Sequence, residues 1–172
     1  MRNKIKETPF TAFVCVSILT IFLLYVTNVI KEIPCEKDMK SIFLSNFIHT
    51  DIFHIIGNLY GLYSLSRVEL QLGTKKFFTL LIFLLVFSTF FEALLHKIIN
   101  TPCSIGFSGI LYGIMTFEVM YSKKFDYNIF TSIIFNIILS KIGNKKVSLT
   151  GHIVGGISGI IGGIIFEKIA KI

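Results

Sequence analysis

A series of long apolar runs constrains this sequence more than any other feature. The chain has 172 residues, of which 53% are hydrophobic and 16% are charged, whereas about a quarter of the residues in a soluble domain are charged. An apolar helix of roughly 20 residues crosses a bilayer. The runs that we expect to do so are residues 10–30, 47–66, 77–95, 105–121, 127–142 and 149–169. The sequence therefore predicts an all-α, polytopic membrane protein with six transmembrane helices. Because the connectors are short, we expect a single membrane-embedded domain over residues 1–172.

The basic charge of the chain is best explained by the membrane. The net charge is +7, but the basic residues are scattered through short connectors and form no compact patch with interleaved aromatic residues. This pattern favours membrane topology and anionic headgroups over nucleic acid. If the N-terminus is cytoplasmic, ten of the 17 Lys and Arg residues lie on the cytoplasmic side and seven on the other. The excess predicts a cytoplasmic N-terminus.

The cysteines and histidines show no metal-binding pattern. Cys15 lies within the first apolar run and is expected to act as a small apolar residue. Cys35 and Cys103 lie in two connectors on the same side of the membrane, and the sequence leaves open whether they pair. Because no motif has metal-ligand spacing, we expect no metal and no cofactor.

Polar residues recur near the start of three of the runs. Ser108 lies at the start of the fourth run and His152 at the start of the sixth, while His54 and Asn58 lie early in the second. These three segments enter the membrane from the same side, so the four side chains lie at similar depths. Polar groups at such depths usually face a protein interior or a wet cavity. Taken alone, a buried serine is more often bonded only to its own helix.

Glycines mark two of these runs as close-packing helices. The fourth run has Gly109 and Gly113, and the sixth has Gly151, Gly155, Gly159 and Gly163 at the same spacing of four. Small residues at this spacing let membrane helices approach closely. A crossing along these glycines would bring Ser108 within hydrogen-bond reach of His152. Tyr112, four residues after Ser108, lies on the same face and could stack on the imidazole. Packing or dimerisation alone is the plainer explanation of such a stripe.

These residue types together permit acyl transfer. Ser108 would be the nucleophile and His152 the base, forming a dyad because no acidic residue lies near His152 in sequence. An oxyanion also needs hydrogen-bond donors. The Ser108 backbone N–H can supply one, and His54 and Asn58, which share one helix face, can supply others. The alternative for that pair is a hydrogen bond between helices.

The motifs resemble those of one family, the rhomboid intramembrane serine proteases. The resemblance rests on four pieces in order: the G-x-S-G of Gly106 to Gly109; the H-x-x-x-N of His54 to Asn58 with an upstream histidine, His49; an E-x-x-x-G-x-x-x-F formed by Glu69, Gly73 and Phe77; and the H-x-x-G-x-x-x-G formed by His152, Gly155 and Gly159.

The resemblance implies a six-helix core with a cavity open to the non-cytosolic side. It implies Ser108 as nucleophile and His152 as general base, with Tyr112 beside His152. His54, Asn58 and the Ser108 amide would support the oxyanion, next to Gly106. The partners implied are the lipid bilayer and single-span transmembrane substrates, with no nucleic acid. The fifth run and the loop of residues 143–148 would form a mobile gate and cap.

The chain departs from the family pattern in its first connector, Lys31–Ser45. This connector is short, and the chain contains no Trp, so the Trp-Arg pair common there is missing. We expect a mixed-charge connector, and the sequence leaves open whether it has the lipid-embedded loop structure seen in the family.

Two other functions compete with proteolysis. One is a catalytically inactive rhomboid-like protein that binds membrane clients, although such relatives typically lose the serine or the histidine. The other is a small channel or transporter that uses Glu92 and Glu118, for which the sequence shows no cationic partner.

Overall fold

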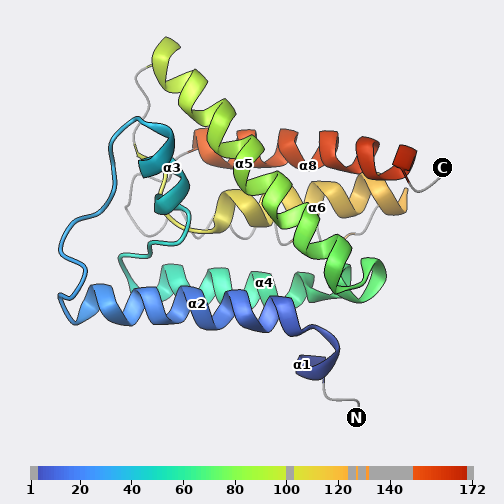
Figure 1. The fold of residues 1–172 in the computed structure, drawn as a ribbon, viewed down its shortest axis with the longest axis horizontal. Coiled ribbons are helices and arrows are strands. Elements are labelled where there is room, and N and C mark those ends of the chain that lie inside the picture. The colour runs from blue at the N-terminus through green and yellow to red at the C-terminus, as the bar shows by residue number, and fades with distance from the viewer. Residues whose placement is uncertain (1–3, 100–102, 124–126, 128–130, 132–148, 170–172) are drawn as a thin grey trace.

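The described part of the chain consists of helices and the loops that connect them, and none of its residues forms a strand. The computed structural model describes residues 4–99, 103–123, 127, 131 and 149–169 (Figure 1). The elements are α1 (Lys4–Glu7), α2 (Pro9–Val26), α3 (Met39–Ser45), α4 (Ile52–Leu72), α5 (Thr74–Ile98), α6 (Ser108–Ser122) and α8 (Leu149–Ile169). Among these, α2, α5 and α8 are long and apolar enough to span a membrane, so the predicted all-helical membrane protein is confirmed. The predicted fifth run, residues 127–142, and the loop of residues 143–148 lie almost wholly outside the described residues.

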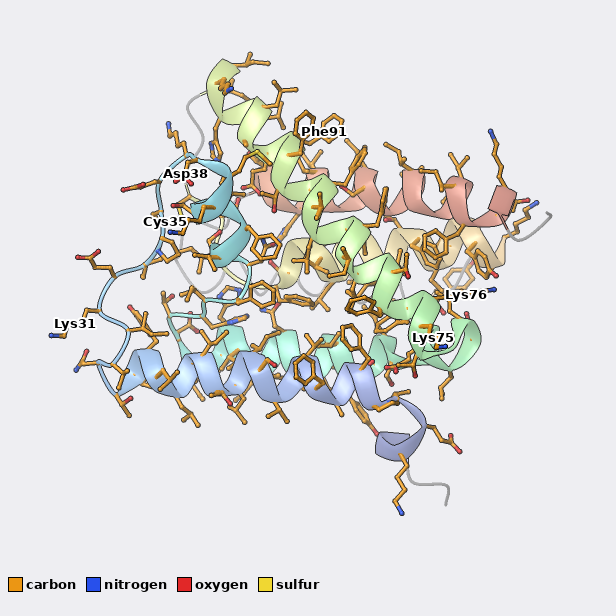
Figure 2. The ribbon with its side chains drawn as sticks, viewed as in Figure 1. Lys31, Cys35, Asp38, Lys75, Lys76 and Phe91 are labelled. Carbon is orange, nitrogen blue, oxygen red and sulfur yellow. A yellow bond between two sulfur atoms is a disulfide. The ribbon has the colours of Figure 1, made fainter. Side chains whose placement is uncertain are left out.

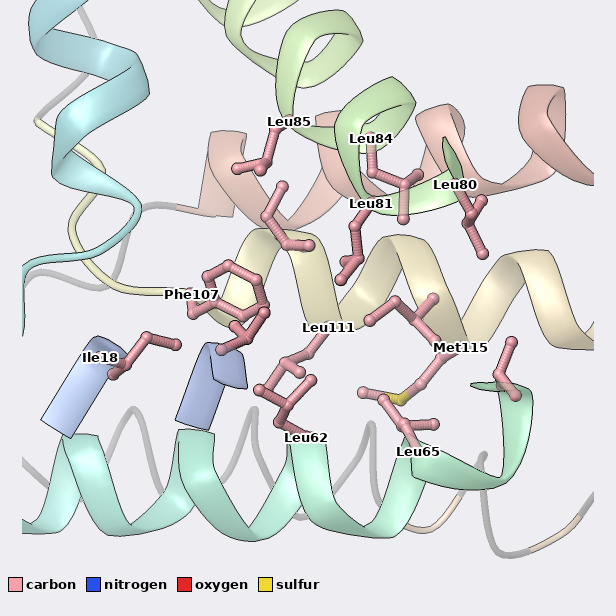
Figure 3. Close-up of a cluster of buried hydrophobic side chains, with 14 of the residues drawn as sticks. Ile18, Leu62, Leu65, Leu80, Leu81, Leu84, Leu85, Phe107, Leu111 and Met115 are labelled. Carbon is pink, nitrogen blue, oxygen red and sulfur yellow. The ribbon is translucent and has the colours of Figure 1, made fainter. Parts of the chain in front are cut away.

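The helices pack around a shared apolar core. Helices α4, α5 and α6 contact one another, while α2 lies along α4 and α8 lies along α6 (Figure 1). Leu62 of α4, Leu84 of α5 and Leu111 of α6 are buried in this core together with Ile18 of α2 (Figure 3). Helices α2, α4, α5 and α6 each contribute one face to the core. Their other faces carry many of the exposed large apolar side chains, as expected for helices in lipid.

Polar residues distinguish the two ends of the bundle. Lys31, Cys35 and Asp38 lie at the end that carries α3, whereas Lys75 and Lys76 lie at the opposite end (Figure 2). Helices α4, α6 and α8 all begin at the first of these ends (Figure 1), which we call the α3 end. The polar residues predicted near the starts of these three helices therefore lie at the same end of the bundle.

Capping residues shift several helix boundaries from the predicted ones. The Asp51 side chain accepts a hydrogen bond from the His54 N–H at 2.8 Å and starts α4 at Ile52 rather than residue 47. Gly73, with φ of +78°, ends it at Leu72 rather than residue 66. The polar turn predicted from residue 67 is therefore a last stretch of helix followed by a one-residue turn.

The other helices shift less. Gly106 has φ of +97°, so α6 begins at Ser108 rather than at residue 105. Helix α2 ends at Val26, short of the predicted residue 30, and α5 extends beyond residues 77–95 at both ends. Helix α8 has the predicted bounds.

The first connector is more ordered than predicted. Within it, α3 begins after Asp38, whose side chain accepts hydrogen bonds from the Lys40 and Ser41 N–H groups at 2.9 and 3.1 Å. Hydrogen bonds from Ser41 also lower the pKa of the Asp38 carboxyl. A disulfide joins Cys35 to Cys103, with Cα atoms 5.4 Å apart. The sequence predicted a mixed-charge connector and named no helix within it, because the Asp38 cap and the packing of α3 on α5 stabilise a short helix that composition does not reveal.

Glu69 joins three elements at the end opposite α3. Its side chain is buried and accepts hydrogen bonds from the N–H groups of Phe10 and Thr11 at 3.0 and 2.8 Å. The hydroxyls of Thr11 and Thr74 donate to it at 2.7 and 2.9 Å. The side chain of Thr8, the residue before α2, does not cap that helix. Glu69, which is distant in sequence, caps it instead. A carboxylate at a helix N-terminus is also favoured by the helix dipole.

Replacing Glu69 should therefore destabilise the bundle. In Glu69→Ala two N–H groups and two hydroxyls lose a charged acceptor, and we expect the free energy of unfolding to fall by about 3 kcal/mol. An exposed carboxylate, Glu32, provides the control, and Glu32→Ala should change the same free energy by less than about 0.5 kcal/mol. The measurement is SDS titration of the detergent-solubilised protein followed by circular dichroism. Equal effects of the two substitutions would contradict the capping role.

Candidate active site

Helices α6 and α8 touch backbone to backbone. A Cβ built at Gly155 would overlap the Gly109 carbonyl, and one built at Gly159 would overlap the Gly113 carbonyl. In the other direction, a Cβ at Gly109 would lie 3.0 Å from the Gly151 carbonyl oxygen. Thr116 Oγ1 donates to the Gly156 carbonyl at 2.8 Å and adds a polar contact between the helices. The predicted glycine-lined crossing is confirmed.

The crossing brings the predicted nucleophile and base together. Ser108 Oγ lies 2.9 Å from His152 Nε2, which is hydrogen-bond distance. Both residues are only partly buried. The Tyr112 ring stacks on the imidazole, with centroids 4.4 Å apart and planes inclined by 25°. This stacking restrains the His152 ring from one face.

His54 lies against the loop that precedes Ser108. A Cβ built at Gly106 would be 2.5 Å from His54 Cε1 and 2.6 Å from its Nε2. The position therefore requires glycine for two reasons, the close imidazole and the positive φ. The His54 ring also lies 4.9 Å from that of His49, centroid to centroid. The absence of a side chain at Gly106 thus leaves room for the His54 ring against the loop, two residues before Ser108.

Asn58 lies one turn after His54 on α4 and is buried. Its Nδ2 donates to the His54 carbonyl at 2.8 Å, and its Oδ1 has no hydrogen-bond partner. The observed bond lies within α4 and is not the hydrogen bond between helices that the sequence offered as the alternative. The amide keeps one further N–H that can serve as a donor.

Two groups that sequence reasoning did not assign hold the loop before Ser108. The Gly106 N–H donates to the Ser45 carbonyl at the end of α3, at 2.9 Å. The Phe107 N–H points to Nε2 of His49, at 3.4 Å, and the His49 side chain is fully buried. His49 belongs to the motif that the sequence shows, as the histidine upstream of His54. The Ser45 carbonyl is a backbone group and leaves no sequence signal.

The two carboxylates considered for a transport path both have partners. Glu118 pairs with Arg67, with Oε1 and Nε 2.8 Å apart, which corrects the expectation that it has no cationic partner. Glu92 accepts a hydrogen bond from Ser104 and lies 3.7 Å from Nε2 of His96. These contacts join helices to one another or to the loop before α6, so they account for the carboxylates without a transport path.

The fold and the site define a class, a helical membrane protein with a serine and a histidine in contact on neighbouring helices. The model of the rhomboid domain matches residues 36–169, and the chain belongs to the rhomboid family. A protein of Acanthamoeba polyphaga mimivirus named as a rhomboid protein is 26% identical over 136 residues, which cover 76% of this chain and 77% of that protein. Rhomboid-like protein 14, mitochondrial, of Arabidopsis thaliana is 26% identical over 153 residues, covering 78% of this chain and 44% of that protein.

Adjacent glycines of α8 provide a test of the helix crossing. Gly155→Ala would push α8 away from the Gly109 carbonyl, and we expect the free energy of unfolding to fall by about 2 kcal/mol. Gly156→Ala is the matched control, because its Cβ would meet only Thr116 Cγ2 at 3.7 Å, and it should change that free energy by less than about 0.5 kcal/mol. Both are measured by SDS titration. A tolerated Gly155→Ala would show that the helices do not cross as closely as described.

Proposed function

We propose that this rhomboid protein is an intramembrane serine endopeptidase. Its substrates would be single-span transmembrane proteins, cut in or next to the bilayer. We further propose that residues 1–172 form one membrane-embedded domain with six transmembrane helices, of which the fifth would comprise residues 127–142. No cofactor or metal takes part in this proposal, because the hydroxyl and the imidazole suffice for acyl transfer.

The observation that carries the proposal is the 2.9 Å contact between Ser108 Oγ and His152 Nε2. A serine hydroxyl is a weak nucleophile until a base removes its proton. The contact supports that transfer, and the stacked Tyr112 ring keeps the imidazole in position. Preorganisation of this kind lowers the entropic part of the barrier.

The reaction would follow from these positions. His152 Nε2 takes the hydroxyl proton while Ser108 Oγ forms a bond to the carbonyl carbon of the scissile peptide. The negative charge that develops on the carbonyl oxygen is stabilised by the Ser108 N–H, His54 and Asn58. His152 then gives its proton to the leaving amine as the C–N bond breaks. A water molecule, deprotonated by His152, then forms a bond to the acyl carbon. The bond between that carbon and Ser108 Oγ breaks as His152 returns the proton to the serine oxygen, which releases the acid product.

The inactive, client-binding alternative receives less support. Binding a client requires neither a serine nor a histidine, yet both residues are present in this chain and in contact. Gly106 and Gly155, whose substitution would disturb the contact, are also present.

Substitution of the dyad tests the proposal. A tagged single-span reporter with small residues near its non-cytosolic end is co-expressed with the protein, and the cleaved fragment is quantified by immunoblotting. Ser108→Ala and His152→Ala should each lower the cleavage rate by at least about a thousandfold, because either loss removes the activated nucleophile. Ser158→Ala is the control, since this buried serine on α8 bonds to Ser88 and the Val154 carbonyl.

A fluorophosphonate probe makes the test independent of the substrate. It should label the wild-type protein and Ser158→Ala but neither dyad variant. A folded wild-type protein that the probe does not label would favour the inactive alternative.

We also propose that the α3 end faces the non-cytosolic side and that the N-terminus is cytoplasmic. The excess of basic residues on the N-terminal side favours this orientation. The disulfide between Cys35 and Cys103 supports it independently, because such bonds persist in oxidising compartments. Both cysteines lie at the α3 end with the candidate site.

Thiol labelling can determine the orientation. In a Cys15→Ala variant expressed in a bacterial inner membrane, a membrane-impermeant maleimide should label intact spheroplasts only after an impermeant reductant opens the disulfide. Labelling that requires lysis of the spheroplasts would place the α3 end in the cytoplasm and reverse the proposed orientation.

A further inference from the structure

Besides the disulfide at Cys103, three hydrogen bonds among the described residues hold the loop before Ser108. The Gly106 N–H donates to the Ser45 carbonyl, and the Phe107 N–H donates to His49 Nε2. The third comes from Ser104, whose Oγ donates to Oε1 of Glu92. The third contact is the one that comes from α5, a helix to which no role in the site has been assigned.

Glu92 is an unusual residue for its position. It lies on an apolar helix that is long enough to span a membrane, and its side chain is 5% exposed. A carboxylate in such a place is costly and is usually functional. Its partners are the Ser104 hydroxyl and the His96 ring on the next turn of α5, with Oε1 and Nε2 3.7 Å apart.

The Ser104–Glu92 contact also lies against α8, one residue before His152. A Cβ built at Gly151 would be 2.9 Å from Ser104 Oγ and 3.8 Å from Glu92 Oε1. The Gly151 carbonyl in turn lies close to Gly109, the residue after Ser108. Gly151 is therefore in contact with both segments that carry the candidate nucleophile, the loop before it and the helix turn after it.

We propose that Glu92 is a positioning residue of the candidate active site. By holding Ser104 against Gly151, it fixes the loop that leads to Ser108 relative to the turn that carries His152. This role rests on the proposed function, in which Ser108 and His152 must stay within hydrogen-bond distance. Among the described residues, the contacts of the His152 imidazole are with Ser108 and the Tyr112 ring, and none is with a carboxylate. The geometry of the dyad therefore depends on backbone packing at Gly151 and on the Tyr112 ring.

Probe labelling gives the first test. We expect Glu92→Ala to lower the rate constant for fluorophosphonate labelling of Ser108 by roughly tenfold to a hundredfold, the range for a small misplacement of reacting groups. Ser104→Ala should lower it as much, and the double variant should lose no more than either single one, because both remove the same contact. Glu92→Gln keeps a carbonyl oxygen that can accept from Ser104 and should retain a rate within about threefold of wild type.

Ser88→Ala is the matched control. Ser88 lies one turn before Glu92 on α5 and also bonds to α8, through Ser158 at 3.0 Å. If Glu92 only stabilised the contact between α5 and α8, then Ser88→Ala would lower the labelling rate similarly. We expect it to lower thermal stability while leaving the rate unchanged. Equal rate losses in Ser88→Ala and Glu92→Ala would overturn the proposal.

Hydrogen–deuterium exchange separates this inference from the proposed function. In Glu92→Ala and Ser104→Ala, backbone amides of residues 103–109 and 150–152 should exchange faster than in wild type, whereas in Ser88→Ala they should not. Unchanged exchange would refute the positioning role whether or not the protein is an enzyme. If the fluorophosphonate probe does not label the folded wild-type protein, the proposed function is refuted instead. If Glu92→Ala does not fold, Ser104→Ala, which removes only one hydroxyl, decides the question.

Discussion

The contact between α6 and α8 is the constraint on which the rest of the structure depends. Lipid is as apolar as a leucine side chain, so helices in a membrane are not driven together by burial from water and must gain their association from close packing and polar contacts. Here the packing partner of each key α8 glycine is a backbone carbonyl of α6, as at Gly155 and Gly159. This approach places an imidazole within 2.9 Å of a hydroxyl, a distance that even one methyl group between the backbones would increase.

Buried polar contacts set how the remaining helices meet. Glu69 at the C-terminal end of α4 caps α2, Arg67 of α4 pairs with Glu118 of α6, and Ser88 of α5 bonds to Ser158 of α8. Each contact joins elements that are distant in sequence. Because an unsatisfied polar group is costly in apolar surroundings, a helix that slid or rotated would lose its partner. Apolar packing alone differs little in free energy between one helix register and the next. These polar pairs make the observed register more stable than its alternatives.

The loop before Ser108 shows how an irregular segment is kept rigid next to a site. Its N–H groups are bonded to α3 and to His49, its Ser104 hydroxyl is bonded to Glu92, and its Cys103 is covalently joined to Cys35. Irregular backbone at membrane depth is tolerated where protein or water satisfies its polar groups. The connections to α3 and α5 therefore satisfy polar groups of this segment and fix its position, as the regular backbone hydrogen bonds do inside a helix.

The amino-acid order alone revealed the membrane class, the helical runs and the approach of Ser108 to His152, because hydropathy and a glycine spacing of four are local properties that act along one helix. The roles proposed for the site residues and the six spans stay predictions. Helix α3 and the partners of Glu92 and Glu118 could not be read in this way. Each depends on a group far away along the chain: α3 on packing against α5, Glu92 on Ser104, and Glu118 on Arg67. Such pairings arise only when the helices are packed, since no local pattern encodes which distant side chain will lie opposite a given residue.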